Sequence, residues 1–226
     1  MPERGLSREQ VARRVAADLL DGMVVNLGIG MPTLVADFIV PGREVVFHSE
    51  NGLLGMGPLA DGEQVDRELV NASKKPVTLL PGGSFFHQAD SFAMTRGGHI
   101  DVAVMGAFQV SANGDMANWR VLGGRERNVG GAMDIAVGVK QLLVMMTHTT
   151  KQGEPKLVAR CTYPVTARGV VRRVFTDLAV IDVTEAGFVL WELAPGLSVE
   201  EVQSATAAPL ALPPGGPKIV SVTEAA

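Results

Sequence analysis

Short apolar runs that alternate with helical patterns are the feature that most restricts the fold of this 226-residue chain. Runs that are apolar throughout are typical of strands covered on both faces, as in a parallel sheet. Such an alternation predicts an α/β fold, with an open, mostly parallel sheet flanked by helices. We expect strands at 23–27, 44–48, 77–80, 101–110, 141–146, 178–183 and 188–193.

The first predicted helix has a clear start signal. Ser7 and Gln10 have capping-box spacing, and the apolar positions from there to Leu20 lie on one helix face. Pro32 is well placed for the first turn of a second helix. Later helices are expected at 85–95, after a Pro-Gly-Gly turn, and after the Ser198 capping box.

No internal repeat or linker divides the sequence. We therefore predict one domain over residues 1–208. Residues 209–226 are rich in Ala, Pro and Gly and are predicted to form a loose tail.

Composition argues against several classes of protein. The formal net charge of −4 argues against a nucleic-acid binder. Cys161 is the single cysteine, which rules out an internal disulfide and a cysteine-based zinc site, and the four histidines lack metal-ligand spacing. No metal site is expected. The absence of a long apolar stretch and of a signal-peptide pattern predicts a cytoplasmic protein without a membrane span.

Two local motifs are weak evidence on their own. Gly28-Ile29-Gly30 follows a predicted strand, but Thr33 occupies the place of the third glycine of a dinucleotide fingerprint. This segment is either a plain turn or a place where backbone N–H groups meet an oxyanion or phosphate. His48-Ser49-Glu50 resembles the HxE motif of zinc deaminases, which also needs two cysteines and is therefore excluded.

The segment SENGLLGMGP, from Ser49 to Pro58, places Glu50 directly after a predicted strand. Asn51-Gly52 is a strong turn signal, so Glu50 could be a turn residue without chemistry. Further glycines recur among apolar residues, which predicts an apolar loop whose backbone can be approached closely. A carboxylate partly stripped of water in such a loop is a candidate nucleophile.

Five segments resemble the B (beta) subunits of 3-oxoacid CoA-transferases. The similarity extends from about residue 7 to residue 205, and SENGLLGMGP is its most specific part. The segments are NLGIGMPTLVADFI, SENGLLGMGP, DSFAMTRGGHID, NVGGAMDIAVG and TDLAVIDVTEAGFVLWELAPG. Residues 59–66 and 121–129 depart from the family pattern, which leaves the choice of acceptor acid open.

The resemblance implies a ping-pong reaction in which Glu50 carries CoA as a glutamyl thioester. Coenzyme A is then a substrate, and no other cofactor is expected. The oxyanion and CoA-binding positions implied by the family are Asn26, Gly28, Gly30, Asn51, Gly52, Gly130 and Gly131. Gly52 is expected to leave room for the thiol of CoA.

The resemblance also implies a partner. Such enzymes combine A and B halves, so we expect a separate A (alpha) subunit, in an A2B2 or higher assembly. Succinyl-CoA with acetoacetate or 3-oxoadipate is the favoured substrate pair. The alternatives are acetate or butyrate as acceptor, hydrolysis of acyl-CoA by the same glutamate, and a phosphate-binding α/β module without catalysis.

Overall fold

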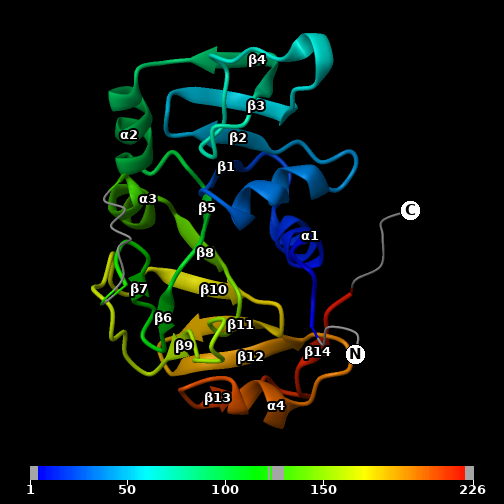
Figure 1. The fold of residues 1–226 in the computed structure, drawn as a ribbon, viewed down its shortest axis with the longest axis vertical. Coiled ribbons are helices and arrows are strands. Elements are labelled where there is room, and N and C mark those ends of the chain that lie inside the picture. The colour runs from blue at the N-terminus through cyan, green and yellow to red at the C-terminus, as the bar shows by residue number, and fades with distance from the viewer. Residues whose placement is uncertain (1–4, 122, 124–129, 222–226) are drawn as a thin grey trace.

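The computed structural model describes residues 5–121, 123 and 130–221. An open sheet of eleven strands runs through the whole molecule (Figure 1). Its strand order is β13-β12-β11-β10-β8-β5-β1-β2-β3-β4, and β14 also pairs with β12. The bounds are β1 Val24–Leu27, β2 Val46–Ser49, β3 Leu53–Leu59, β4 Val77–Phe85, β5 Val102–Met105, β8 Gln141–Met145, β10 Val171–Phe175, β11 Ala179–Thr184, β12 Gly187–Leu193, β13 Leu210–Ala211 and β14 Lys218–Ile219.

The middle of the sheet is parallel. Strands β2, β1, β5, β8 and β10 pair in the same direction. The flanking pairs β2–β3, β3–β4, β10–β11 and β11–β12 are antiparallel. The prediction of an open, mostly parallel sheet is confirmed. A second, three-stranded sheet is formed by β6 Gln109–Ser111, β7 Met116–Ala117 and β9 Leu157–Val158.

Helices cover both faces of the parallel strands (Figure 1). On β5, Val102 and Val104 face α1, whereas Ala103 and Met105 face α3, as the two-residue period of a strand requires. Both faces are therefore apolar. The helices are α1 Arg8–Asp18, α2 Gln88–Arg96, α3 Ala132–Gly138 and α4 Val199–Ser204, with 3-10 helices η1 Met31–Phe38 and η2 Gly62–Gln64.

Helix signals in the sequence are confirmed at two ends of the chain. Ser7 and Ser198 form the predicted capping boxes of α1 and α4. The second helix, at Pro32, is correctly placed but is a 3-10 helix. Its N-cap is Gly30, which has no side chain to hold the first turn.

The predicted Pro-Gly-Gly turn is wrong, because Pro81, Gly82 and Gly83 lie inside β4. The register between β3 and β4 shifts around this point, which is the sign of a bulge. Glycine and proline mark a bulge as readily as a turn. The predicted strand at 101–110 is also divided, because the chain leaves β5 and joins the small sheet as β6.

Part of the predicted loose tail is held to the sheet. Leu210–Ala211 and Lys218–Ile219 add two short strands to β12, and Val220 is buried. Short pairings separated by proline and glycine leave little periodicity in the sequence to detect.

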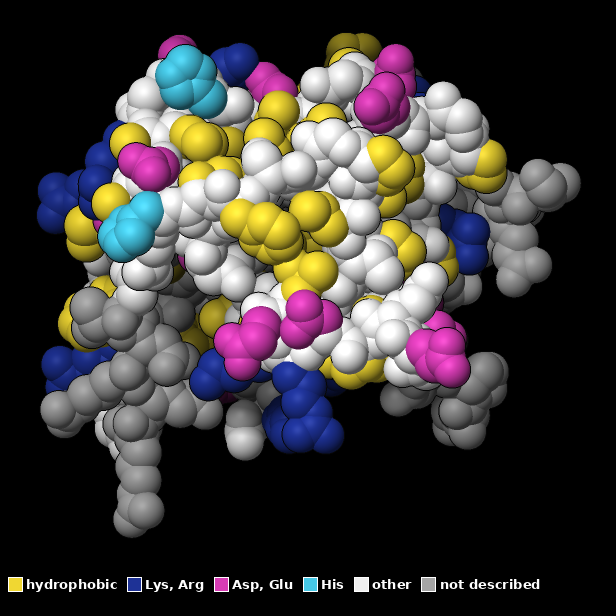
Figure 2. Space-filling model, turned by 90° about the horizontal axis from the view of Figure 1, so that it is seen from above, with side chains coloured by type: hydrophobic (Ala, Val, Ile, Leu, Met, Phe, Trp, Pro, Cys, Tyr) yellow, Lys and Arg dark blue, Asp and Glu magenta, His cyan; other side chains and the backbone are white. Residues whose placement is uncertain are grey.

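Strand β4 forms one edge of the large sheet and carries exposed apolar side chains. Leu80 and Phe85 are 43% and 68% exposed, and Leu59 on β3 is 47% exposed. Figure 2, which views the molecule from this end, shows hydrophobic side chains gathered near the middle of the face, with acidic side chains around them. This end of the sheet is therefore an uncovered, partly apolar surface.

Candidate active site

Parallel pairing of β1 with β2 brings two predicted site residues together. Asn26 on β1 is in register with His48 on β2, and Glu50 follows just beyond the end of β2. The chain then turns back, with the Gly52 N–H donating to the Ser49 carbonyl over 3.0 Å, and runs antiparallel as β3. Carboxyl ends of parallel strands are where α/β sheets place ligand sites.

Asn26 holds Glu50 by a side-chain hydrogen bond. Its Nδ2 lies 3.3 Å from Oε2 of Glu50, 3.3 Å from the His48 carbonyl oxygen and 3.1 Å from His48 Nδ1. Asn26 is 1% exposed, whereas Glu50 is half-buried. The amide nitrogen faces the carboxylate because the amide oxygen would be repelled there. This contact supports the predicted pairing of Asn26 with Glu50.

His48 is a buried part of the same network. Its Nε2 lies 2.8 Å from Ser91 Oγ on α2, and its ring stacks on Phe86 at 6.1 Å between centroids. Burial lowers the pKa of His48 to about 4, so the ring is neutral at pH 7. Nδ1 can then accept from Asn26 while Nε2–H donates to Ser91. His48 was not predicted as a site residue; its place two residues before Glu50, at the end of β2, was the available signal.

Gly55 and Gly57 lie in strand β3, and Gly52 lies in the turn before it, so most of the predicted apolar loop is a strand. A Cβ on Gly52 would overlap the carbonyl oxygen of Phe86, and one on Gly57 would overlap Thr78 Oγ1 of β4. A Cβ on Gly55 would lie 2.9 Å from the Gly83 Cα. These glycines allow β3 and the segments beside it to pack closely against each other. The Phe86 carbonyl occupies the position that a side chain on Gly52 would take, and the expected role of Gly52 in admitting the thiol of CoA stays a prediction.

The Gly28–Gly30 turn follows β1 as predicted, and the N–H groups of its two glycines are hydrogen-bonded within the protein. The Gly28 N–H donates to the Val104 carbonyl over 2.8 Å, so this N–H is engaged within the sheet, and a role of Gly28 in binding CoA stays a prediction. The Gly30 N–H lies 3.3 Å from Ser73 Oγ. Gly28 is packed close to β5, where a Cβ would meet the Val104 oxygen at 3.1 Å.

The side chain of Asn51, predicted to bind CoA or an oxyanion, is hydrogen-bonded within the protein. Its Nδ2 donates to the Val70 carbonyl over 2.9 Å, so the side chain fastens the turn to the loop before β4. That loop includes the atypical residues 59–66, which contain the end of β3 and η2. Residues 122 and 124–129 of the other atypical segment lie outside the described residues.

A cleft of about 800 Å³ opens beside Glu50. Four of the predicted site residues line it: Gly28, Glu50, Gly130 and Gly131. Gly131 precedes α3, and a Cβ there would overlap the ring of Phe92. The other walls are mainly apolar, with Met105, Ala107, Phe108, Ile135, Met145 and Met146 among them. The cleft is thus mostly apolar and contains one carboxylate, that of Glu50.

Lys156 lines the same cleft and was not singled out from the sequence. Glu50 and Lys156 are the two ionisable side chains among the described residues that line it. Burial lowers the pKa of Lys156 to about 8, and Asp177 acts in the opposite sense. Because Lys156 lies 106 positions after Glu50 in the printed sequence, no local spacing links them.

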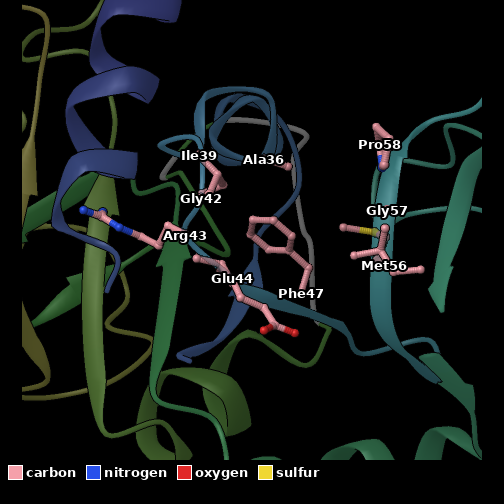
Figure 3. A pocket seen from close by; sticks show the side chains of 11 residues that line it. Ala36, Ile39, Gly42, Arg43, Glu44, Phe47, Met56, Gly57 and Pro58 are labelled. Carbon is pink, nitrogen blue, oxygen red and sulfur yellow. The ribbon is translucent and has the colours of Figure 1, made fainter. Parts of the chain in front are cut away.

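A second cavity, of about 390 Å³, lies between η1, β2 and β3 and offers no comparable chemistry (Figure 3). Phe47 and Met56 face its interior. The guanidinium of Arg43 is turned toward α1, where it donates to the carbonyls of Ala17 and Leu19. The cleft beside Glu50 is therefore the candidate active site.

Across 5–121, 123 and 130–221, no group of three or more His, Cys, Asp or Glu side chains is arranged to hold a metal ion. None of the helices in that part of the chain has the length and apolar character needed to cross a membrane.

Solved structures share the fold at low sequence identity. An acyl-CoA transferase apoenzyme from Escherichia coli O157:H7 matches with a TM-score of 0.76 and 19% identity, over 96% of this chain and 44% of that one. This chain thus spans less than half of that enzyme. The glutaconate coenzyme A-transferase of Acidaminococcus fermentans matches with a TM-score of 0.71 and 16% identity, over 98% of this chain and 91% of that one.

Other proteins have much higher sequence identity to this chain than those solved structures. The B subunit of the 3-oxoadipate CoA-transferase from Pseudomonas putida is 54% identical over 208 residues, which cover 91% of this chain and 96% of the relative. The B subunit of a succinyl-CoA:3-ketoacid coenzyme A transferase from Helicobacter pylori is 48% identical, covering 89% and 97%. The family model of coenzyme A transferase matches residues 8–205. The predicted resemblance is confirmed, and the chain belongs to the coenzyme A transferase family.

Proposed function

We propose that this chain is the B subunit of a 3-oxoacid CoA-transferase, which moves CoA from an acyl-CoA, with succinyl-CoA favoured, to a 3-oxoacid such as acetoacetate or 3-oxoadipate. The observation that carries the proposal is the contact between Glu50 and Asn26 at the edge of the cleft. A carboxylate with a fixed amide donor beside it can be both nucleophile and leaving group. The relatives named as B subunits support the same assignment.

Glu50 starts the reaction as the nucleophile. Its carboxylate oxygen attacks the thioester carbonyl, the C–S bond breaks, and CoA thiolate leaves behind an acyl-glutamyl anhydride. The thiolate then attacks the glutamyl carbonyl and releases the donor acid as a carboxylate. The acceptor carboxylate repeats both steps in reverse order. Charge balances throughout, because each attacking anion replaces a departing anion and no proton is transferred.

Asn26 is suited to stabilise the oxyanion that forms on the glutamyl carbonyl. An N–H donor already positioned at Oε2 needs little movement when negative charge develops there. A single donor of this type contributes roughly 3 to 4 kcal/mol to the transition state. Gly130 and Gly131, which line the same cleft, are proposed to approach the acyl group or CoA.

A partner chain, the A (alpha) subunit, is part of the proposal. Relatives of similar length are named as B subunits, and this chain spans less than half of the E. coli enzyme. Ile29, which lines the cleft, is 70% exposed, and Met133 and Val137 of α3, a helix that contributes two other residues to the cleft, are 58% and 65% exposed. Covering them would exclude water, which otherwise hydrolyses an anhydride. An A2B2 or higher assembly is expected, and mass photometry of the co-expressed chains measures it.

The decisive experiment is Glu50→Ala in the pair co-expressed with its A subunit. Wild type should transfer CoA from succinyl-CoA to acetoacetate and show a covalent CoA adduct by intact mass. Glu50→Ala should lose the adduct and at least roughly 10⁴-fold of the rate, as expected for loss of a nucleophile. Glu44→Gln, a carboxylate at the second cavity, is the matched control and should behave as wild type. Full transfer by Glu50→Ala would refute the proposal.

A thioester hydrolase using the same glutamate is the second candidate, because the cleft is open in this chain alone. The two are separated by omitting the acceptor acid. A transferase then stops at the covalent adduct, whereas a hydrolase continues to release free CoA.

A further inference from the structure

The cleft contains a cation that the proposed mechanism does not use. Lys156 lines it together with Glu50, and the remaining described lining residues are not ionisable. Within the described ranges, no carboxylate lies within ion-pair distance of its ammonium group. Its Nζ instead lies 3.4 Å from Thr147 Oγ1, which lines the same cleft. A half-buried ammonium without a close counter-ion favours an anionic ligand.

The backbone holds Lys156 firmly at this place. Its N–H donates to the His148 carbonyl over 3.0 Å, and its carbonyl accepts from Val110 N–H over 2.9 Å. The hairpin of residues 148–156 therefore returns to the carboxyl end of β8, beside the small sheet. Strand β8 is three strands from β2 in the sheet, a separation of about 14 Å at the usual strand spacing. Lys156 and Glu50 thus approach one cleft from separate strands.

We propose that Lys156 binds the second carboxylate of dicarboxylic substrates and so sets the preference for them over monocarboxylic acids. This inference rests on the proposed function. One carboxylate of the acid must react at Glu50, so a cation farther along the cleft can hold only a group at the other end of the acid. Succinyl and 3-oxoadipyl groups have such a carboxylate, whereas the acetoacetyl group ends in a methyl group.

Partial desolvation of Lys156 fits this role. Burial lowers the pKa of its ammonium to about 8, so the charged form is present at neutral pH but is poorly solvated. A carboxylate that replaces the missing water forms a charge-assisted hydrogen bond, which is stronger than one between neutral groups. The apolar walls from Met105, Met145 and Met146 strengthen the attraction.

The test measures discharge of the covalent enzyme–CoA adduct by different acids. The pair is loaded from acetoacetyl-CoA, freed of acetoacetate, and mixed with acetoacetate, 3-oxoadipate or succinate. Lys156→Met should slow discharge by the dicarboxylic acids on the order of tenfold to a hundredfold, the range for one charged hydrogen bond. Discharge by acetoacetate should be unchanged. Lys156→Arg should retain most of the dicarboxylate rate, and Lys151→Met, in the same hairpin but exposed, should match wild type.

Three results would overturn the inference. Equal slowing by all acids would mean that Lys156 supports the cleft without reading the second carboxylate. Slower loading of Lys156→Met from acetoacetyl-CoA would instead mean that the ammonium group of Lys156 binds the phosphates of CoA. A wild-type pair that accepts acetoacetate but no dicarboxylic acid would leave no such preference to explain. Failure of wild type to form any adduct is a separate result, which overturns the proposed function and this inference with it.

Discussion

The side-chain nitrogen of Asn26 lies 3.3 Å from Oε2 of Glu50, across the parallel pair of β1 and β2. The two residues are 24 positions apart in the sequence, and the sheet register brings them together. One strand thus supplies the carboxylate and its neighbour supplies the donor. The geometry depends on how accurately β1 and β2 are aligned.

Asn26→Ala should lower kcat by roughly 10²- to 10³-fold, because one oxyanion donor is lost. The covalent adduct should still form, but more slowly, in a rapid-quench mass measurement. Asn51→Ala is the matched control, since its amide donates to the Val70 carbonyl outside the cleft. Its kcat should stay near the wild-type value. An unchanged kcat in Asn26→Ala would remove Asn26 from the mechanism.

His48 is expected to act as a positioning residue, through Asn26. His48→Phe keeps a ring beside Phe86 but removes both hydrogen bonds, to Asn26 and to Ser91. We expect kcat to fall by about tenfold, the equivalent of one hydrogen bond, with little change in KM. His48→Gln, which can accept from Asn26 and donate to Ser91, should restore much of the rate. A fall in KM and kcat together, without rescue, would indicate general damage instead.

Sequence patterns predicted the parts of this fold that are set by local chemistry. The apolar runs around Val25 and Phe47 gave β1 and β2, and the turn signal at Asn51-Gly52 placed Glu50 at a strand end. The resemblance then supplied its role. The bulge at Pro81 and the pairing of Lys218 with β12 were missed, because both depend on which distant strand lies alongside.

The sequence predicted some residues of the candidate site and missed others. Glu50 and Gly131 line the cleft as expected. Gly52 was assigned to CoA, yet the Phe86 carbonyl occupies the space of its missing side chain. Lys156 was missed because sequence spacing does not report distances across a sheet. A glycine can be required either where two backbone segments pack closely or where a ligand binds. Only the tertiary packing shows which of the two roles applies.

Gly52 and Gly30 allow the structural role of Gly52 to be measured. Both have positive φ, at +111° and +90°, so alanine is strained at either position. That strain costs on the order of 1 to 3 kcal/mol. A Cβ at Gly30 meets nothing, whereas one at Gly52 overlaps the Phe86 carbonyl. Urea unfolding should therefore show a clearly larger loss for Gly52→Ala than for Gly30→Ala. Equal losses would mean that β3 can move aside at no cost.

Acid should destabilise the fold through two buried histidines. His148 is 0% exposed, with Thr176 Oγ1 2.9 Å from Nδ1 and Thr206 Oγ1 2.8 Å from Nε2. Burial lowers the pKa of both His148 and His48 to about 4, from an ordinary value of 6.5. Between these values the unfolded chain binds more protons than the folded chain, so the free energy of unfolding falls as pH decreases from about 6.5 to about 4. Each histidine contributes about 3 kcal/mol over that range.

The slope of stability against pH identifies the groups responsible. Well below pH 6.5, each buried neutral histidine adds about 1.4 kcal/mol per pH unit to the slope. When urea unfolding is measured at several pH values, the slope of the unfolding free energy against pH should therefore be smaller in His148→Gln by close to one such increment. This holds even if the variant is less stable at pH 7. His99→Gln replaces a histidine outside both buried networks and serves as the control. An unchanged slope in His148→Gln would mean that His148 is already protonated in the folded protein, and that its two threonine partners accept from both ring nitrogens.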